Sequence, residues 1–460
     1  MSSYDDFERE DRETREREAA DRVFQELLGR LGEGEPQPRL EPVRRVVELL
    51  GDPHRAFPVI HITGTNGKTS TSRMIESLLR ATGLRTGLLT SPHLHRFNER
   101  ILIGGEPITD ERLVANWRDI EPYVGMVDKA LTEEGEPRLT YFEAIVVLAF
   151  AAFADAPVDV AVIEVGMGGE WDATNVVESQ VAVFTPIALD HQNRLGRTVA
   201  EIARTKSGII KPVSEVVSAV QPSTALEELE RAAALTESRL VVEGSGFTVT
   251  SAVAIGGQLI SVSGRAGLYE DVFLPLYGDH QAHNAALAIA AVESFLGGGT
   301  VPLEQDVVID GLAAASSPGR LQLVGAEPPV LVDAAHNPHG ARSLAAALQS
   351  YFAFSPIYAV VATLEDKDSE GLFRALAPMV EEFIVTTAPS ERATDVDTLA
   401  AIAVKVAGAD KVRVEPSLGA ALDAARESAA EHENGAVVVY GSITLVGRAM
   451  EISVDEGWRP

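Results

Sequence analysis

Short apolar runs alternate with helix-like and Gly-rich stretches along much of the chain. Residues 58–62 and 86–90 are apolar runs of strand length, and residues 70–81 between them have the pattern of a helix. This order predicts a βαβ unit, in which the two strands lie parallel in one sheet. Residues 158–165 and 181–185 are two further runs, apolar enough to be covered on both faces. We therefore expect a parallel sheet with helices on both sides.

The hydrophobic period changes in the segment 240–276. Apolar and polar residues alternate there between Gly-Gly and Ser-Gly turn signals, which is typical of antiparallel strands. A helix is predicted at 283–295, and beyond it a second series of apolar runs alternates with Ala-rich helical sequence. A second doubly wound domain is therefore expected. Its strands are predicted at 329–333, 357–362, 382–387, 411–415 and 435–440.

The two series of strands predict two domains with a boundary between them. The boundary is expected at residues 313–318, where Ala and Ser residues lead into a Pro-Gly-Arg turn. The first domain is then 37–313, and the second, smaller one is 314–460. Residues 1–36 are highly charged, and we expect a partly mobile segment in which only residues 20–31 form an amphipathic helix.

Composition and charge narrow the classes of function. The chain has 460 residues, 45% of them hydrophobic, which is enough for two cores. Its 39 basic residues against 68 acidic ones give a net charge of −29, which disfavours a nucleic-acid partner. There is no Cys, so disulfides, thiolate zinc sites and a cysteine nucleophile are excluded. Anionic ligands must bind where backbone N–H groups, metal ions or a few basic side chains make the site locally positive.

Neither a targeting segment nor a membrane span is predicted. Residues 1–20 lack the apolar core of a signal peptide. The longest apolar run, 144–154, is too short to cross a bilayer and predicts a buried helix instead. We expect a cytoplasmic protein with no membrane partner.

The strongest local motif is TGTNGKTS at residues 63–70, between the first predicted strand and helix. Its Gly residues let backbone N–H groups approach phosphate oxygens, Lys68 reaches the outer phosphates, and the hydroxyl of Thr69 or Ser70 can hold magnesium. Ile62 stands where the general P-loop pattern has Gly, so a chance Gly-rich turn is the alternative. The predicted ATP-binding residues of this loop are Gly64, Thr65, Asn66, Gly67, Lys68, Thr69 and Ser70.

The fold class expected from these patterns is α/β. A P-loop parallel-sheet ATPase domain with appended antiparallel strands comes first, and a smaller doubly wound α/β domain follows it.

Several motifs resemble those of one enzyme family. GTNGKT at 64–69 resembles the variant P-loop of the Mur ligase superfamily. TSPHLHRFNERI at 90–101 is similar to the segment after the second strand in folylpolyglutamate and dihydrofolate synthases. EVGMGGEWDATN at 164–175, ALDH at 188–191 and RTKSGIIK at 204–211 resemble further motifs of that family.

The resemblance implies two magnesium sites. Ser91 and Glu164 are implied as ligands of one ion, and His191 as a ligand of the second. Lys206 is implied to be carbamylated by carbon dioxide, which turns its amine into a carboxylate-like metal ligand. A carboxylate at the end of a buried parallel strand suits metal binding, because ligands of open α/β sheets bind at the carboxyl ends of strands. The alternatives are a Glu paired with an Arg, a core His bonded to Asp190, and an ordinary surface Lys.

Two residues depart from the family's pattern. Glu170 stands where many relatives have Arg, and Thr205 stands where Glu usually precedes the carbamylated Lys. We therefore assign no anion-binding role to position 170.

Motifs in the second half of the chain resemble the family's nucleotide and interface motifs. The resemblance of the YGDHQAHN motif implies that Asn284 lies near the adenine of ATP. The resemblance of the SPGR motif makes Arg320 a candidate phosphate ligand, because a guanidinium suits oxyanions. The LVDAAHNP motif implies that Asp333 and His336 contact ATP from across a cleft. EDKD at 365–368 resembles the family's Asp-Lys-Asp turn.

The matching motifs follow the family's order, and the resemblance implies an ATP-dependent ligase. In the reaction that the resemblance implies, ATP phosphorylates a substrate carboxylate, and the amine of L-glutamate attacks the acyl phosphate to give an amide, ADP and phosphate. The implied substrates are ATP, L-glutamate, dihydropteroate and a reduced folate, and we expect a bifunctional monomer. The predicted catalytic residues are Lys68, Lys206 and His336, and the predicted substrate-binding residues are Thr140, Tyr141, Phe142, Glu143, Trp171, Asp172 and Ala173.

Two other functions stay open. One is a cell-wall ligase that joins an amino acid to a UDP-muramyl peptide. The Ser-Pro-His segment that begins at Ser91 and the short region before the P-loop argue against it. The other is a P-loop nucleotide-binding regulator without ligase activity. The presence of Glu164, His191 and Lys206 together argues against a regulator, because a pure nucleotide binder needs no second metal site.

Overall fold

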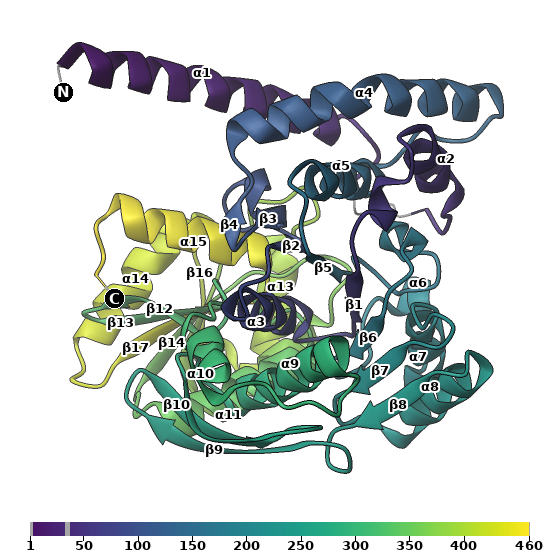
Figure 1. Ribbon diagram of the computed structural model, residues 1–460. Helices are drawn as coiled ribbons and strands as arrows, with labels where there is room; N and C mark the ends of the chain where they lie inside the picture. The colour runs from purple at the N-terminus through teal and green to yellow at the C-terminus, as the bar shows by residue number, and fades with distance from the viewer. Residues whose placement is uncertain (1–2, 33–36, 460) are drawn as a thin grey trace.

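The computed structural model describes residues 3–32 and 37–459, and of residues 3–11 it describes the backbone only. The largest sheet is formed by β1 (Val59–Thr63), β2 (Thr86–Leu89), β3 (Ile101–Ile103), β4 (Glu106–Pro107), β5 (Val160–Glu164), β6 (Val181–Phe184), β7 (Glu215–Ser218) and β8 (Arg239–Val242). Their order is β4-β3-β2-β5-β1-β6-β7-β8 (Figure 1). β3 and β4 are antiparallel to their neighbours, whereas β2, β5, β1, β6, β7 and β8 run parallel to one another. The predicted parallel sheet is confirmed.

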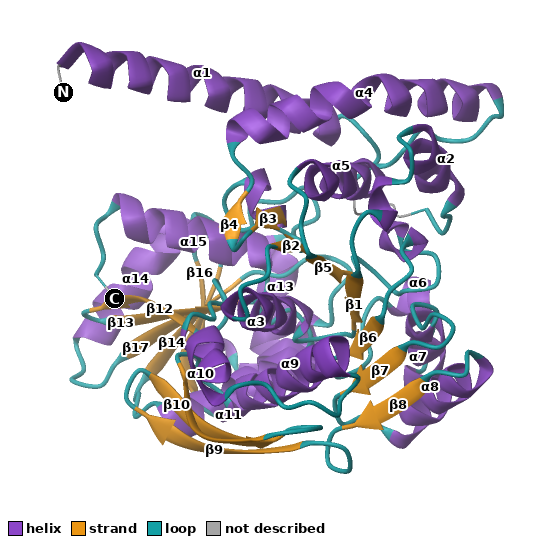
Figure 2. Cartoon of the chain, in the orientation of Figure 1, coloured by secondary structure: helices purple, strands orange, loops and turns teal. Residues whose placement is uncertain are grey.

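Helices cover both faces of this sheet, because successive residues of a buried strand point to opposite sides (Figure 2). Ile60 and Ile62 of β1 belong to the core on one face, whereas Val59 belongs to the core on the other. The first face is covered by α3 (Lys68–Ala81), α9 (Asp279–Gly297) and α10 (Gln305–Ala313). The second is covered by α5 (Tyr141–Asp155), α7 (Val199–Ser207) and α8 (Ser223–Leu235), with α1 (Ser3–Leu28), α2 (Glu41–Leu49) and α4 (Asp110–Glu133) packed behind α5.

Antiparallel strands are appended to the parallel core, as predicted, and they form a three-stranded sheet that packs on the first face. It consists of β9 (Thr248–Ala254), β10 (Gly257–Ser263) and β11 (Leu268–Leu274). The predicted start of this region at residue 240 is wrong, because Leu240 lies in β8 and pairs in parallel with Val216 of β7. The chain passes through α8 between β7 and β8, and such a helical crossover returns the next strand in parallel. The helix α9 also begins earlier than predicted, at Asp279.

The second α/β sheet has the order β12-β13-β17-β14-β15-β16, in which only β12 is antiparallel to its neighbour. Its strands are β12 (Gln322–Ala326), β13 (Pro329–Asp333), β14 (Ile357–Val361), β15 (Val380–Val385), β16 (Val412–Val414) and β17 (Ala436–Tyr440). Helices α11 (Pro338–Tyr351), α12 (Ser369–Leu376) and α13 (Val396–Ala407) cover one face, and α14 (Leu418–Ala430) and α15 (Ile443–Asp455) cover the other. The doubly wound second domain is confirmed. Its boundary at residue 314 stays a prediction, in a segment that joins α10 to β12.

The N-terminal helix is longer than the sequence pattern predicts. We expected a helix only at residues 20–31, but α1 runs from Ser3 to Leu28 and extends beyond the body of the protein (Figure 1). Its second half buries Ala20, Val23 and Leu27 in the core. The first half is rich in Glu and Arg, which favour helix without an apolar face. The prediction for residues 33–36 lies outside the described residues.

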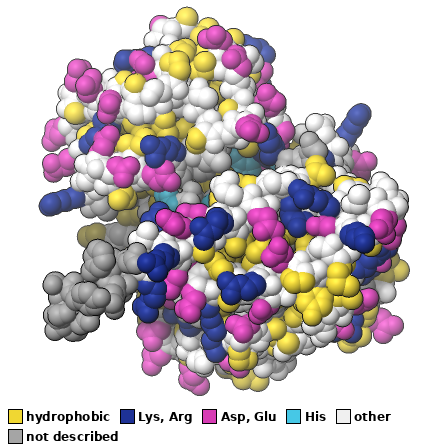
Figure 3. All heavy atoms as spheres, turned by 90° about the horizontal axis from the view of Figure 1, so that it is seen from above, with side chains coloured by type: hydrophobic (Ala, Val, Ile, Leu, Met, Phe, Trp, Pro, Cys, Tyr) yellow, Lys and Arg dark blue, Asp and Glu magenta, His cyan; other side chains and the backbone are white. Residues whose placement is uncertain are grey.

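Among the described residues, no helix is long and apolar enough to cross a membrane. Basic and acidic side chains are interspersed on the face shown in Figure 3, where histidine side chains are visible in a hollow between two lobes.

Candidate functional site

A cavity of about 640 Å³ lies between the two α/β sheets. Strands from both sheets point their carboxyl ends at it, so that Gly64 after β1, Glu164 at the end of β5 and Asp333 at the end of β13 all line it. This is the usual ligand position in open α/β sheets. The predicted site residues in its wall are Gly64, Thr65, Asn66, Gly67, Lys68, Thr69, Ser70, Ser91, Thr140, Phe142, Glu143, Glu164, Trp171, Asp172, Ala173, His191, Lys206, Asn284, Arg320, Asp333 and His336.

Tyr141 is the exception among the predicted site residues. It is buried outside the cavity wall, with its ring 5.3 Å from the guanidinium of Arg100 and 6.5 Å from the ring of Phe97. The substrate contact of Tyr141 stays a prediction, and its ring packs against Arg100 and Phe97.

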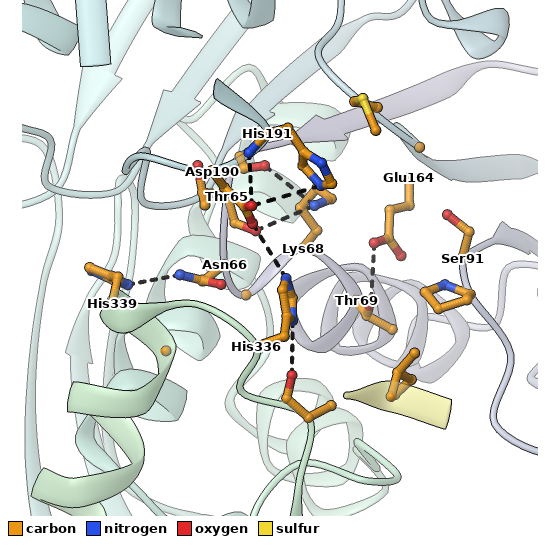
Figure 4. A pocket seen from close by; sticks show the side chains of 18 of the residues that line it. Thr65, Asn66, Lys68, Thr69, Ser91, Glu164, Asp190, His191, His336 and His339 are labelled. Carbon is orange, nitrogen blue, oxygen red and sulfur yellow. Dashed lines mark hydrogen bonds and ion pairs between the residues drawn. The ribbon is translucent and has the colours of Figure 1, made fainter. Parts of the chain in front are cut away.

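The phosphate loop requires glycine at two positions. A side chain on Gly64 would place its Cβ 1.8 Å from Thr185 Oγ1, and one on Gly67 would lie 2.7 Å from Asn284 Oδ1. Both glycines have positive φ, of 149° and 89°. The helix α3 begins at Lys68, so its N–H groups and the positive end of its dipole face the cavity (Figure 4). The sequence from β1 to α3 thus has the geometry of a phosphate-binding loop.

Glu164 has the chemistry of a ligand for a hard cation. The hydroxyl of Thr69 donates to Glu164 Oε1 at 2.9 Å, while Oε2 is buried without a hydrogen-bond partner. Burial raises the pKa of Glu164, and the nearby charge of Lys68 acts against that rise. Ser91 lines the same part of the cavity. The donor set fits magnesium, which prefers oxygen and is commonly held by one or two carboxylates together with substrate phosphates.

No group of three or more His, Cys, Asp or Glu side chains that could hold a metal occurs in residues 3–32 and 37–459. A metal here would therefore depend on hydroxyls, phosphates and water in addition to Glu164.

Asp190 is the electrostatic centre of the wall opposite Glu164. Its Oδ1 accepts from Lys367 Nζ at 2.8 Å, and its Oδ2 accepts from Asn337 Nδ2 at 3.0 Å and lies 3.4 Å from His336 Nε2. Burial alone would raise the pKa of Asp190, but His336 and Lys367 hold it far below its usual value. Asp190 and Lys367 stand in motifs that resemble the family's, yet the sequence reasoning assigned no role to either. Periodicity carries no signal for a pair 177 residues apart.

His191 stands beside this centre as a neutral imidazole. Burial first, and then the charge of Lys367, lowers the pKa of His191 to about 3. Its Nε2 lies 3.5 Å from Lys367 Nζ and 4.0 Å from Asp190 Oδ1, and its Nδ1 lies 3.9 Å from Asp366 Oδ2. His191 is bonded to Asp190 through its backbone N–H, which donates to Oδ1 at 2.8 Å, rather than through its ring, whose Nε2 lies 4.0 Å from that oxygen. A neutral imidazole can act as a metal ligand.

Lys206 is buried in the last turn of α7 and donates from Nζ to the carbonyl oxygen of Gly64 at 2.8 Å. Burial and the charge of Lys68 lower the pKa of Lys206 to about 7. It is therefore not an ordinary surface lysine. Glu170 and Thr205, the two residues that depart from the family's pattern, are joined by a backbone hydrogen bond, in which Glu170 N donates to Thr205 O at 2.8 Å. Neither side chain lines the cavity in the described residues.

The second domain completes the cavity through polar contacts with the phosphate loop. Asn66 and Asn337 exchange two side-chain hydrogen bonds, of 3.1 and 3.0 Å, and Ser70 Oγ lies 2.7 Å from Ser317 Oγ. His339 Nδ1 lies 2.9 Å from Asn66 Nδ2. The sequence reasoning did not find these bridges, because each joins segments more than 200 residues apart.

Two of the predicted residues of the second domain, Asp333 and His336, contact backbone groups of nearby residues. Asp333 accepts from Leu321 N and Ala335 N, both at 2.8 Å, and burial raises its pKa. Burial lowers the pKa of Arg320, whose guanidinium interacts with Asp333. His336 Nδ1 faces Ala334 O at 2.9 Å, and since a carbonyl oxygen only accepts, Nδ1 carries the proton.

The rest of the cavity wall consists of aromatic side chains and of carboxylates that already have hydrogen-bond or ion-pair partners. Phe142 and Trp171 line it, whereas Glu143 is bound to Arg39 at 3.0 Å and closes a capping box with Thr140 at the start of α5. Such a wall suits a flat aromatic ligand. Asp172 accepts from Met167 N at 2.8 Å and from Thr174 N at 3.0 Å.

Comparison with known proteins gives consistent matches. The Mur ligase middle domain matches residues 62–292, and the Mur ligase glutamate ligase domain matches residues 319–443. The chain is 43% identical over 440 residues to the dihydrofolate synthase/folylpolyglutamate synthase of Mycobacterium tuberculosis, covering 90% of each chain. It is 38% identical over 355 residues to the enzyme of the same name from Bacillus subtilis, covering 76% of this chain and 81% of that one.

Solved structures agree with the sequence matches. The Mycobacterium tuberculosis folylpolyglutamate synthase complexed with ADP and AMPPCP superposes with a TM-score of 0.90 at 42% identity, covering 95% of this chain and 99% of that one. E. coli FolC in complex with DHPP and ADP gives a TM-score of 0.78 at 31% identity, covering 91% and 94%. The chain therefore belongs to the dihydrofolate synthase/folylpolyglutamate synthase family of Mur ligases.

Proposed function

We propose that this protein is an ATP-dependent ligase that joins L-glutamate to the carboxylate of a folate-type substrate. The same site would convert dihydropteroate to dihydrofolate and add further glutamates to reduced folates. The observation that carries the proposal is one cavity in which a phosphate loop, a carboxylate suited to magnesium and an aromatic wall face one another between two domains. The relatives named for both synthase activities support it.

In the proposed reaction, negative charge develops on the transferred phosphoryl group, close to positively charged groups of the chain. An oxygen of the substrate carboxylate attacks the γ-phosphorus of ATP, and ADP leaves. The glutamate nitrogen then attacks the acyl carbon, the bond to phosphate breaks, and one proton of the amine is released. Lys68 and the N-terminus of α3 bind the phosphates and neutralise charge that spreads over the transferred phosphoryl group. No nucleophilic side chain is required, because the substrate carboxylate is the nucleophile in the first step.

Magnesium, when bound, would add positive charge at the phosphates of ATP. Glu164, Thr69 and Ser91 would hold it, and the buried Oε2 atom of Glu164 supports this assignment. For a second ion we propose His191 and Lys206 as ligands. A carbamate on Lys206 forms when its neutral amine takes up carbon dioxide and releases a proton. A pKa of about 7 favours this, because a large fraction of the amine is neutral near neutral pH.

The other predicted residues take roles at the two ends of the cavity. Arg320, Asp333 and His336 would contact ATP from the second domain, and Asn284 would lie at the adenine end. Phe142 and Trp171 would stack on the pterin, with Thr140, Glu143, Asp172 and Ala173 forming the rest of that wall. The relative that binds DHPP supports a pterin at this family's site. We also propose that the enzyme works as a monomer and without nucleic acid, which the net charge of −29 supports.

One assay tests the proposed function. Glutamate-dependent release of ADP is measured with dihydropteroate, tetrahydrofolate and a UDP-muramyl peptide as separate carboxylate donors. We expect turnover with the first two and none with the third. Turnover only with the UDP-muramyl peptide would identify a cell-wall ligase, and no turnover with any donor would favour the non-catalytic alternative.

A further inference from the structure

A buried chain of three polar side chains leads from β1 to the wall of the main cavity. It joins His61 of β1, Thr174 of the short helix η3 (Ala173–Val176) and Asp172. His61 Nε2 lies 2.9 Å from Thr174 Oγ1, which donates to Asp172 Oδ1 at 2.5 Å. Asp172 lines the cavity, whereas His61 and Thr174 do not. All three residues are at most 5% exposed, so the chain is shielded from solvent.

The hydrogen bonds of this chain run in one direction. Burial, and then the charge of Lys211, lowers the pKa of His61 to about 3, so its ring is neutral. The only hydroxyl proton of Thr174 is used in the bond to Asp172, so Thr174 Oγ1 accepts from His61 Nε2. The opposite direction would need a protonated Asp172, yet its Oδ1 also accepts from Thr174 N at 3.0 Å and its Oδ2 from Met167 N at 2.8 Å. Burial raises the pKa of Asp172, but a carboxylate with several such donors stays ionised.

The second oxygen of Asp172 lies beside the aromatic wall. A Cβ on Gly166 would lie 3.2 Å from Asp172 Oδ2 and 2.6 Å from Cζ of Phe142, so the oxygen and the ring surround the same point of the wall. A carboxylate oxygen has two lone pairs and only accepts hydrogen bonds. A ligand that stacks on the wall must therefore turn N–H or O–H donors toward Asp172. The aminopyrimidine edge of a pterin has such donors.

The strand that leads into the phosphate loop holds this segment at two points. In addition to the contact of His61, Thr63 Oγ1 donates to Gly168 O at 2.7 Å. The two side chains lie on the same face of β1, because they are two residues apart. Gly64, the first residue of the phosphate loop, follows Thr63 directly. One strand therefore sets the position of Asp172 relative to the loop.

We propose that His61 and Thr174 are positioning residues that fix the carboxylate of Asp172 as the acceptor for the N–H donors of the substrate's heteroaromatic ring. The inference rests on the proposed function for the identity of that ring. It goes beyond that function in giving a role to two buried residues that do not line the cavity. The hydroxyl of Thr174 holds Oδ1 and so sets the rotation of the carboxylate, which leaves a lone pair of Oδ2 directed at the ligand. Loss of the hydroxyl lets the carboxylate rotate and weakens ring binding, while the phosphate loop is unchanged.

The first test compares Thr174→Val with Thr174→Ser in steady-state kinetics. Val keeps the shape and removes the hydroxyl, so the KM for dihydropteroate should rise by about fivefold to twentyfold. The kcat and the KM for ATP should stay within about twofold, because the lost interaction binds ground state and transition state alike. Ser keeps the hydroxyl, and its KM should lie within about threefold of the wild type.

Thr86→Val is the matched control. Thr86 is also buried, and its Oγ1 donates to the buried carboxylate of Glu76 at 2.5 Å, but neither residue lines the cavity. Its replacement should lower the free energy of unfolding about as much as Thr174→Val does. Every kinetic constant should nevertheless stay within about twofold of the wild type. A purely structural effect of a lost buried hydroxyl is thereby separated from a positioning effect.

A ligand variant identifies the donor that Asp172 accepts from. A dihydropteroate analogue without the 2-amino group should inhibit the wild type more weakly than dihydropteroate binds to it. Because the donor is already missing, Thr174→Val should raise its inhibition constant at least about threefold less than it raises the KM for dihydropteroate. An equal loss for both compounds would overturn the proposal.

The direction of the chain is measured without turnover. Nitrogen NMR of the wild type labelled in histidine should show His61 with its proton on Nε2 and none on Nδ1, and His61→Gln assigns the signal. The amide of Gln places an N–H close to the position of Nε2, so this variant should keep the dihydropteroate KM within about threefold. His61→Leu offers no donor and should raise that KM as Thr174→Val does.

The outcomes separate this inference from the proposed function. A dihydropteroate KM within twofold of the wild type in Thr174→Val overturns the inference, as does an equal rise in the KM for ATP or an equal effect of Thr86→Val. A proton on Nδ1 of His61 overturns it as well, because the chain would then run the other way. A wild-type protein without turnover on any carboxylate donor would instead overturn the proposed function, while the NMR measurement still decides the direction of the chain.

Discussion

Lys206 Nζ donates a hydrogen bond to the carbonyl oxygen of Gly64 at 2.8 Å, which joins the last turn of α7 to the first residue of the phosphate loop. The same carbonyl lies 3.3 Å from Lys68 Nζ. Two lysines therefore converge on one backbone oxygen, and this proximity contributes to the low pKa of Lys206. The arrangement makes the charge of Lys206, and any modification of its amine, directly relevant to the loop that we propose binds ATP.

Replacing Lys68 with Ala should lower kcat/KM by about a hundredfold to a thousandfold, because one positioned cation is lost from the phosphoryl-transfer site. Stability should change little, since the hydrogen bonds of Nζ in the described part of the chain are long, at 3.3 and 3.5 Å to backbone carbonyls. Its attraction to Glu164 and its repulsion of Lys206 are lost together and act in opposite directions. Steady-state kinetics and thermal unfolding check both parts. Wild-type turnover in the variant would contradict the phosphate-loop assignment.

Replacing Glu164 with Gln should lower activity by about a hundredfold, and excess magnesium should rescue it poorly, because the charged metal ligand is gone. The metal-free protein should be at least as stable as the wild type. Burial disfavours the charged form of Glu164, and Gln removes that cost while keeping the shape. Melting in EDTA and magnesium titrations of activity test the two expectations. A variant with lower stability and unchanged activity would show that Glu164 is structural.

The low pKa of Lys206 predicts a pH dependence of stability. With a pKa of about 7 in the folded state against 10.5 in the unfolded chain, the unfolded state binds more protons between these values. The free energy of unfolding of the wild type should therefore rise with pH in this window, relative to Lys206→Met. Between pH 7 and pH 9 the relative gain should be about 2–3 kcal/mol. Denaturant unfolding without metal, nucleotide or carbon dioxide measures it, and a pH-independent difference would contradict the low pKa.

Carbamylation of Lys206 predicts chemical rescue. Lys206→Ala should lose activity and regain part of it with a short carboxylate such as acetate, because the missing group is an oxygen ligand. The wild type should show the added mass of a carbamate at neutral pH under carbon dioxide. Rescue by a short amine instead, or full activity of the variant without any addition, would show that no carbamate is needed.

Replacing Lys367 with Met should destabilise the protein by about 1–3 kcal/mol, because it leaves the buried carboxylate of Asp190 without its cation. Adding Asp190→Asn should recover part of that loss, so the two changes should not be additive. The KM for ATP should also rise, since the pair joins the two domains around the cavity. Denaturant unfolding of the single and double variants measures the coupling, and purely additive effects would contradict it.

Much of the fold and of the phosphate loop could be predicted from sequence, because the signals are local. The apolar runs on either side of residues 70–81 predict the βαβ unit. The Gly residues at 64 and 67 predict the tight loop, and the structure explains them, because its backbone leaves no room for a Cβ at either position. Where the local signal was ambiguous, the prediction was wrong. Alternation did not reveal the parallel pairing of Leu240, and the charged sequence before Ala20 gave no apolar face from which to predict the helix.

The sequence by itself determined two α/β domains, a phosphate loop and the set of residues that surround one cavity. Only the tertiary structure decided how those residues pair. Asp190 with Lys367 and Asn66 with Asn337 join segments 177 and 271 residues apart, and Tyr141 packs against Arg100 and Phe97 while Phe142 lines the cavity. The physical reason is that hydrophobic period and turn chemistry act over a few residues. A buried ion pair or a shared backbone oxygen depends instead on how two separately folded layers pack against each other.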